Sequence, residues 1–153
     1  KTRERSPRRM ASGVKASDEF VTAFNNMKIP GKGDRIAFLS GVIDGGFVVL
    51  KEQVNHSDVG EGLSPEEYHA KILEKFSESD PMFAVIDFRF SDDKGEQAKL
   101  VLVKWIPDNC SAKNRMHYAS SAEGVKAQLP GFSKEVQGND FSDISFNEIR
   151  GKF

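Results

Sequence analysis

The sequence lacks three features that would place it in a large class of proteins. It has one cysteine, Cys110, so it offers neither an internal disulfide nor the CxxC spacing of redox and zinc sites. No apolar run reaches the ~18–20 residues of a membrane-spanning helix, and no secretory signal segment is visible. The formal net charge of -1 gives no basic excess for binding nucleic-acid phosphates. These absences favour a protein of a reducing compartment, the cytoplasm or the nucleus.

Apolar residues, by contrast, suffice for one core. The chain has 153 residues, of which 38% are hydrophobic, and one domain usually takes roughly 100–200 residues. The first nine residues, KTRERSPRR, differ from the rest because they hold five basic residues and one acidic residue. Subtracting them from the totals of 22 basic and 23 acidic residues leaves 17 and 22. We therefore separate a basic extension, residues 1–9, from one domain, residues 10–153.

The extension has two interpretations. Met10 opens a second start, MASGV, directly after it, which favours a remnant of cloning or of an upstream segment. The alternative is a nuclear-import or nucleic-acid-binding arm, because short runs rich in lysine and arginine are typical of both. The acidic balance of residues 10–153 argues against nucleic-acid binding by the domain itself.

Hydrophobic periodicity and turn residues predict the element order αββαββαβα. The predicted helices cover residues 17–27, 64–78, 111–129 and 141–151, and the predicted strands cover residues 35–40, 46–54, 82–90, 99–105 and 133–137. We expect the first two strands to pair antiparallel, and the third and fourth to form the sheet centre. The fold class is therefore α/β (α+β), with a mixed central β-sheet sandwiched between α-helices.

Residues that could carry catalysis or bind a metal occur singly. His56, His69 and His117 lack the HxxxH and HExxH spacings of metal sites, so we expect surface or packing roles for them. Cys110 has no neighbouring base that would activate it as a nucleophile. The glycines form no GxGxxG or GxxxxGK[ST] phosphate-binding loop. The sequence therefore predicts no catalytic residue, no metal site and no cofactor.

The predicted helix over residues 111–129 carries the most informative pattern. Its apolar residues at i, i+4, i+7 and i+11 form the expected buried stripe, namely Tyr118, Ala122, Val125 and Leu129. The residues that point away from or flank this stripe are Lys113, Arg115, Met116, Ser120 and Lys126. One interpretation is a solvated basic face with an incidental exposed methionine. The other is a contact surface, on which methionine packs against a partner while the cations meet its carboxylates.

The segment WIPDNCSAKNRMHYASS, residues 105–121, resembles the actin-depolymerising factor (ADF)/cofilin family. That family typically has W-x-P-D/E, two spaced basic residues, methionine and then Tyr-Ala-Ser-Ser at this place. Three further segments are similar to the family: MASGV at residues 10–14, FAVIDFRF at 83–90 and VQGNDFSDIS at 136–145. The resemblance covers nearly all of residues 10–153. It implies a single ADF homology domain, which agrees with the predicted element order.

The resemblance implies an actin-binding protein that is not an enzyme. Such a protein binds ADP-actin monomers and filaments, severs and depolymerises filaments, promotes actin turnover, and works as a monomer in the cytoplasm and cytoskeleton, or in the nucleus with actin. Carried over by position, the residues that contact both monomers and filaments are Ser12, Gly13, Val14, Lys113, Arg115, Met116 and Ser120. The filament-specific residues are Lys99, Arg150 and Lys152. Ser12 also matches the serine whose phosphorylation inactivates family members.

The chain departs from the family pattern after Tyr-Ala-Ser-Ser. Where the family has a lysine-rich helix end, this chain keeps only Lys126, so inhibition by phosphoinositides is expected to be weak. Gly124 follows Ser120 and Ser121 by one turn and predicts a kink, which either fits the helix to a groove on actin or curves it round the sheet. The sequence ends at Phe153, before a longer basic helix end, which makes severing less secure. The alternative function is a coactosin-like filament side-binder without strong severing.

Overall fold

The computed structural model describes residues 13–29 and 34–153, in which six strands form one mixed sheet. The strands are β1 (Lys15–Ala16), β2 (Ile36–Asp44), β3 (Phe47–Asn55), β4 (Met82–Asp92), β5 (Gly95–Trp105) and β6 (Lys134–Gly138). Their order across the sheet is β1-β3-β2-β4-β5-β6. The four inner strands pair antiparallel, whereas β1 and β6 join the two edges in parallel. The basic extension, residues 1–9, and the expected phosphorylation site, Ser12, lie outside the described residues.

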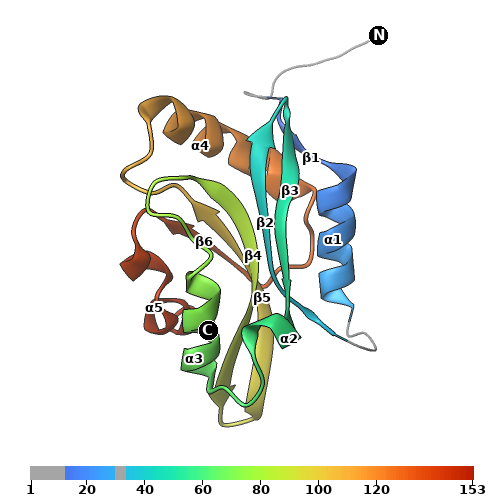
Figure 1. The fold of residues 1–153 in the computed structure, drawn as a ribbon, viewed down its shortest axis with the longest axis vertical. Coiled ribbons are helices and arrows are strands. Elements are labelled where there is room, and N and C mark those ends of the chain that lie inside the picture. The colour runs from blue at the N-terminus through green and yellow to red at the C-terminus, as the bar shows by residue number, and fades with distance from the viewer. Residues whose placement is uncertain (1–12, 30–33) are drawn as a thin grey trace.

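Helices cover both faces of this sheet (Figure 1). They are α1 (Asp18–Lys28), α2 (His56–Val59), α3 (Pro65–Leu73), α4 (Ala112–Ala127) and α5 (Phe146–Arg150), with a 3-10 helix, η2 (Phe141–Ile144), before α5. The predicted α+β fold, with a mixed sheet between helices, is therefore confirmed. Within the described part of the chain, no helix has both the length and the apolar character needed to cross a bilayer.

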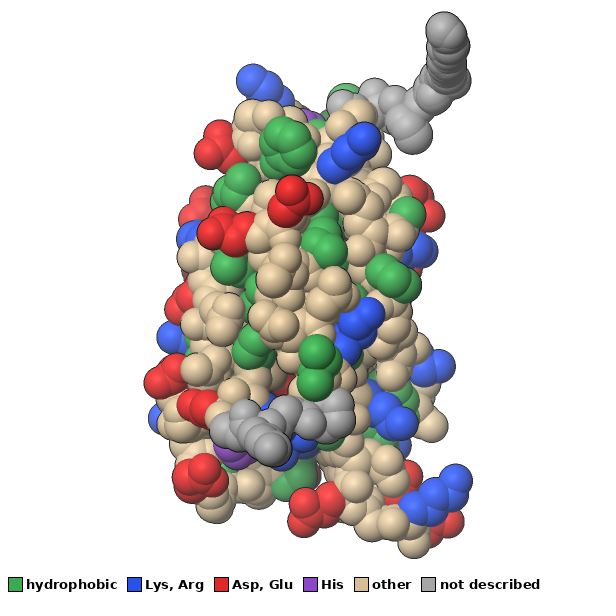
Figure 2. All heavy atoms as spheres, turned by 90° about the vertical axis from the view of Figure 1, so that its right-hand side faces the viewer, with side chains coloured by type: hydrophobic (Ala, Val, Ile, Leu, Met, Phe, Trp, Pro, Cys, Tyr) green, Lys and Arg blue, Asp and Glu red, His purple; other side chains and the backbone are tan. Residues whose placement is uncertain are grey.

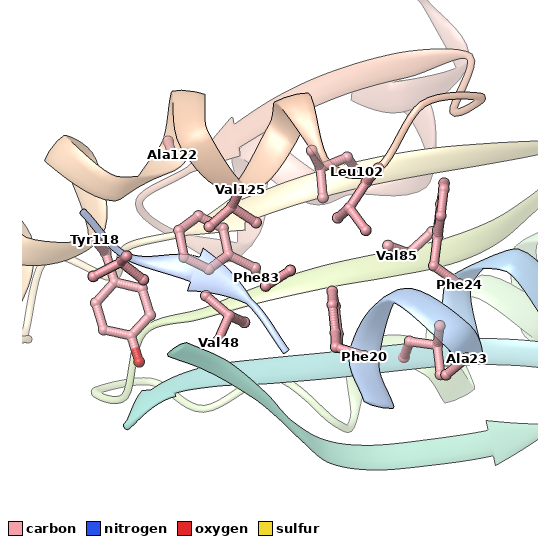
Figure 3. Packing of buried hydrophobic residues seen from close by; sticks show 14 of the residues in the cluster. Phe20, Ala23, Phe24, Val48, Phe83, Val85, Leu102, Tyr118, Ala122 and Val125 are labelled. Atoms are coloured by element: carbon pink, nitrogen blue, oxygen red, sulfur yellow. The ribbon is translucent and has the colours of Figure 1, made fainter. Parts of the chain in front are cut away.

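Two apolar clusters, one on each face of the sheet, form the core. One cluster joins α1 and α4 to the sheet, as Figure 3 shows for Phe20 of α1, Val125 of α4 and Phe83 of β4. The other joins α3, η2 and α5 to the opposite face. Because side chains alternate between the faces of a strand, β4 contributes Phe83 and Val85 to the first cluster and its even-numbered neighbours to the second. The strand is therefore buried on both faces, as its continuous apolar run predicts.

Serine side chains fix where the longer helices begin. Ser17, Ser64 and Ser111 each accept a hydrogen bond from a backbone N–H in the first turn of α1, α3 and α4. Ser64 and Glu67 form a capping box, because the Glu67 carboxylate also accepts the Ser64 N–H at 3.0 Å. The start of α4, which positions the candidate site, is thus set by local sequence.

The predicted helix over residues 64–78 is too long, because α3 ends at Leu73. The chain after it is held by tertiary contacts that a continued helix would not make. The Phe76 ring packs edge-on against Trp105 with 5.4 Å between ring centroids, and the Trp105 Nε1–H donates to the Ser77 carbonyl at 2.7 Å. Packing on the sheet therefore ends the helix five residues before the sequence pattern does.

Other boundaries also differ from the predictions. The single helix predicted over residues 141–151 is two, because Ser145 ends η2 and caps α5. The charged segment at 92–97, expected as a loop, is mostly strand, since Asp92 pairs with Gly95 across a two-residue turn. The centre of the sheet is the β2–β4 pair, with β5 one place further out. The short elements β1 and α2 were not predicted, because neither is long enough to show a period.

Candidate functional site

The outward face of α4 is the candidate binding surface. The predicted buried stripe is confirmed, because Tyr118, Ala122, Val125 and Leu129 are all buried. On the opposite side of the helix, Lys113 and Ser120 are exposed, and Met116 exposes 74% of its surface. An apolar side chain this exposed is available to pack against a partner. The structure thus brings Lys113, Met116 and Ser120 together on one face of one helix.

Arg115 lies beside this face but is held within the molecule. Its Nη2 donates to the Asp108 carbonyl at 2.9 Å, and its Nη1 lies 4.0 Å from the Asp108 carboxylate. The side chain stays partly exposed. These contacts restrict the guanidinium to one orientation over the segment that leads into α4. A side chain restricted in this way loses less conformational entropy when it binds a partner.

Tyr118 attaches α4 to the sheet (Figure 3). Its ring stacks on Phe83 of β4 with 5.3 Å between centroids, and its hydroxyl accepts the Ile43 N–H of β2 at 2.9 Å. Burial raises the pKa of Tyr118 above its ordinary value of 10.0, so the hydroxyl stays neutral near pH 7. Sequence periodicity predicted the buried ring but could not reveal the hydrogen bond to a strand 75 residues away.

The amino-terminal candidates lie on the same side of the sheet as α4. Gly13 is exposed, whereas Val14 exposes only 5% of its surface and belongs to the core cluster that contains α4. The Val14 side chain therefore points into the molecule, contrary to the expectation of a surface contact, and Gly13 presents the accessible surface here. Ser12, the expected phosphorylation site, lies outside the described residues.

The carboxyl-terminal half of α4 contains the residues at which a kink was expected. The helix runs unbroken from Ala112 to Ala127, past Gly124, where a kink was predicted. The hydroxyls of Ser120 and Ser121 do bond back along the helix, both to the His117 carbonyl, at 3.2 Å and 2.7 Å. Ser121 is also buried, although it was not among the residues of the predicted buried stripe. These bonds satisfy the hydroxyl groups without ending the helix.

Lys126 is paired with carboxylates rather than free for a ligand. Its Nζ lies 3.0 Å from Glu135 of β6 and 3.4 Å from Glu123 one turn earlier. The hydrogen bond to Glu135 is the main cause that raises the pKa of Lys126 above its ordinary value. Because two carboxylates neutralise this ammonium group, it offers little attraction to an anionic lipid headgroup.

Two of the three expected filament-specific residues line one shallow hollow. Lys99 of β5 and Arg150 of α5 lie there together with Asp92, Asp93 and Lys94 of the β4–β5 turn region. Lys152 is exposed but is not among the lining residues. Residues 51 positions apart in the sequence thus meet at one end of the sheet, away from α4 (Figure 1).

Aromatic rings support this second region. The Phe153 ring lies 5.2 Å from the Phe90 ring and 6.0 Å from the Phe88 ring. The Arg150 guanidinium lies over the Phe90 ring at 4.5 Å, and the Lys134 ammonium lies 5.7 Å from the Phe153 ring. Such cation–π contacts stabilise a cation while leaving its hydrogen-bond donors available. Sequence analysis placed Arg150 near the end of a helix but did not find this aromatic cluster.

The buried His69 side chain contacts both the sheet and the carboxyl-terminal segment. It is 3% exposed, lies edge-on to Phe88 and Phe146, and donates from Nε2 to the Ile144 carbonyl at 2.7 Å. Burial lowers the pKa of His69 below its ordinary value of 6.5. The predicted packing role is therefore confirmed for this histidine. Among the described residues no three His, Cys, Asp or Glu side chains are grouped closely enough to hold a metal ion.

A buried polar cluster beside α3 was missed by the sequence analysis. Asp87 of β4 is buried, and Arg89 donates to its Oδ2 from Nε and Nη2 at 3.0 Å and 2.8 Å. The guanidinium lies over the Tyr68 ring at 5.0 Å, and the Tyr68 hydroxyl is 2.9 Å from His56 Nδ1. Burial raises the pKa of Tyr68 to about 12. The available signal was a charged pair, at i and i+2, inside an otherwise apolar strand.

The surface charge is mixed on the face over α1 and the β1–β3 edge. Figure 2 shows acidic and basic side chains interspersed there rather than gathered by sign. The described residues of this face therefore form no basic patch that could follow a nucleic-acid backbone.

Known proteins resemble this chain in sequence over most of its length. Residues 13–153 match the sequence model of the family described as cofilin/tropomyosin-type actin-binding protein. The chain is 34% identical over 141 residues to cofilin of Saccharomyces cerevisiae, with 90% of each chain covered.

Solved structures show the same fold at lower identity. The structure of Streptomyces griseoflavus cofilin superposes with a TM-score of 0.75 at 24% identity, covering 92% of this chain and 96% of that one. The structure of human coactosin-like protein superposes with a TM-score of 0.68 at 20% identity, covering 93% and 89%. On the strength of the sequence matches, the chain belongs to the ADF/cofilin family of actin-binding proteins.

Proposed function

We propose that the protein binds ADP-actin monomers and filaments through the outward face of α4, and that it severs and depolymerises filaments. The observation that carries the proposal is Met116, which exposes 74% of its surface between two cationic side chains. Family membership supplies actin as the partner. The activity involves no covalent chemistry, because binding alone shifts the state of the filament.

The α4 face suits a helix-in-groove contact. Burying one methionine side chain contributes roughly 1.5–3 kcal/mol, which is the scale of an interface anchor. Lys113 and Arg115 lie on either side of this anchor, where they meet carboxylates on an acidic partner surface. The contact thus has an apolar centre with cations close beside it, where the partner desolvates them on binding.

Filament binding uses the second region as well. Lys99, Arg150 and Lys152 contact a neighbouring subunit while the α4 face holds the first. Two linked contacts raise the affinity for a filament above the affinity for a monomer, because the second contact forms within one complex. Severing follows when a filament whose two subunits are held in this way adopts a geometry that weakens its own contacts.

Co-sedimentation with ADP-actin filaments tests the proposal. We expect the protein to enter the pellet and the amount of soluble actin to rise with its concentration. Met116→Ala should weaken both effects about tenfold, since tenfold is ~1.4 kcal/mol, within the range for one buried methionine. The matched control is Ile29→Ala, which removes an apolar side chain at the end of α1 that is 60% exposed. Equal losses from both variants would overturn the assignment of α4.

A coactosin-like side-binder is the second candidate. Two observations favour it: the fold matches coactosin-like protein nearly as well as cofilin, and the only lysine in the second half of α4 is paired. The same experiment separates the two functions. Co-pelleting without a rise in soluble actin indicates a side-binder, whereas co-pelleting with a rise indicates a depolymerising factor.

Regulation is proposed at two points. Phosphorylation of Ser12 adds about -1.5 to -2 charges next to Gly13, where repulsion by acidic groups on actin would weaken binding. Phosphoinositide binding is expected to be weak because Lys126 is already paired. A Ser12→Glu variant should bind actin less tightly than Ser12→Ala, and equal affinities would contradict the first point. We place the protein with the actin cytoskeleton of the cytoplasm, acting as a monomer.

A further inference from the structure

Gly124 lies where the amino-terminal segment of the chain packs against α4. A Cβ atom added at this position would lie 3.3 Å from the Val14 carbonyl oxygen, closer than side chains normally approach. Glycine weakens a helix interior relative to alanine, so its presence in the middle of α4 requires another cause. The close approach of the Val14 backbone supplies that cause. Gly124 therefore serves a contact between two segments.

Gln128, one turn further along, holds the same segment by a hydrogen bond. Its Oε1 accepts the Ala16 N–H at 2.7 Å. On the other side of the segment, the N–H groups of Lys15 and Ser17 donate to the carbonyls of Gly46 and Val48, at 3.2 Å and 3.0 Å. Successive N–H groups of an extended chain point in opposite directions. The segment is thus bonded to β3 by one edge and to α4 by the other.

Side-chain burial anchors the segment at the same place. Val14 and Ala16 expose 5% and 4% of their surfaces, and both belong to the core cluster that includes α1 and α4. Gly13, the residue next to Val14, is exposed. The position of Gly13 relative to α4 is therefore set by the contacts of the three residues that follow it.

We propose that Gly124 and Gln128 are positioning residues that fix the amino-terminal part of the actin-binding surface relative to the α4 face. The inference rests on the proposed function. Neither residue touches actin; each holds the segment from Val14 to Ala16, so that the exposed Gly13 lies at a fixed place beside α4. A surface ordered before binding avoids the entropy cost of ordering it on contact.

Gln128→Met and Gln128→Glu form the matched pair for the test. Methionine keeps the length of the side chain but removes the acceptor, whereas glutamate keeps an acceptor for the Ala16 N–H. Two measurements are made on each variant: hydrogen exchange of the Ala16 amide and affinity for ADP-actin monomers. We expect Gln128→Met to speed exchange at Ala16 and to weaken monomer binding about tenfold, while Gln128→Glu retains both properties.

Gly124→Ala gives a second, independent measurement. The new methyl group must push the Val14 carbonyl away by a few tenths of an ångström, while alanine raises the helix propensity of α4. We expect monomer binding about threefold weaker with an unchanged or higher melting temperature, a combination that loss of stability would not produce.

The outcomes separate this inference from the proposed function. Lys113→Ala combined with Arg115→Ala is measured in the same assay. If that double variant binds less tightly while Gln128→Met and Gly124→Ala bind as the unaltered protein does, the positioning inference alone is overturned. If the double variant also binds as the unaltered protein does, the proposed surface and the inference fall together. Failure of Gln128→Glu to retain affinity would likewise overturn the inference.

Discussion

The α4 face and the carboxyl-terminal region rest on the sheet through different chemistry. Below α4, aliphatic side chains and the stacked Tyr118–Phe83 pair form the support, and the polar contact is a tyrosine hydroxyl that accepts a strand N–H. Below α5, stacked phenylalanine rings and a buried histidine do this work. The second support thus contains a buried histidine, the side chain type whose ordinary pKa lies between pH 5 and 8.

The two regions also differ in what they expose. The α4 face presents an apolar side chain with cations beside it, while the carboxyl-terminal hollow presents cations and carboxylates of both signs. Contacts with desolvated apolar anchors determine dissociation rates, whereas contacts of exposed charges mainly determine association rates and salt dependence. We therefore expect high salt to weaken filament-specific binding more than monomer binding.

The largest expected effect comes from removing the support of α4. Tyr118→Ala deletes a buried ring together with the acceptor for the Ile43 N–H, and should lower the free energy of unfolding by about 3–5 kcal/mol. Urea denaturation measures it. The control is Tyr118→Phe, which keeps the ring and should cost about 1 kcal/mol. If both variants were equally stable, the Tyr118 ring would contribute nothing to stability and would not be part of the support of α4.

Removing the cations of the α4 face comes next. Lys113→Ala with Arg115→Ala should weaken binding to ADP-actin monomers by about 2–3 kcal/mol, because the interface desolvates the charge pairs that these residues form. The melting temperature should change little. Titration of labelled actin monomers measures the affinity. Lys51→Ala with Lys71→Ala, two exposed lysines away from α4, serves as the control. A loss of the same size in the control would show a general charge effect rather than a binding surface.

A smaller and more selective effect is expected at Phe153. Phe153→Ala removes the ring that lies against Phe88 and Phe90, so the Phe90 ring, over which the Arg150 guanidinium lies, loses a packing neighbour. Filament binding should fall about tenfold, ~1.4 kcal/mol, the scale of one aromatic contact. Monomer binding should stay unchanged, and Phe153→Tyr should restore filament binding. Equal losses for monomers and filaments would remove the distinction between the two regions.

Sequence reasoning succeeded where a local rule decides the structure. The residues of the stripe from Tyr118 to Leu129 recur with helical spacing, and α4, which is 16 residues long, is long enough to show that spacing clearly. The Ser111 cap sets the start of the helix. The exposure of Met116 follows from the same period. The mixed sheet between helices also follows, since apolar strands and amphipathic helices have few ways to bury their faces together.

Sequence reasoning failed where distant residues decide. Leu73 ends α3 because Phe76 and Ser77 are held by Trp105, which no local pattern contains. The close approach of Gly124 to Val14 was also missed, because the two residues are 110 positions apart. A glycine allows either a bend or a close approach, and only the folded chain distinguishes them.

The smallest effect, on pH dependence, tests the chemical difference between the two supports. Because burial lowers the pKa of His69 below 6.5, the unfolded chain takes up a proton at a higher pH than the folded chain does. The unfolded state then binds more protons, so stability falls on acidification, by up to about 1.4 kcal/mol per pH unit. His69→Gln, whose amide can still donate to the Ile144 carbonyl, should flatten this fall. Urea denaturation between pH 7.5 and pH 5 measures the effect, and parallel curves for His69→Gln and the unaltered protein would show that this histidine does not make the carboxyl-terminal support sensitive to acid.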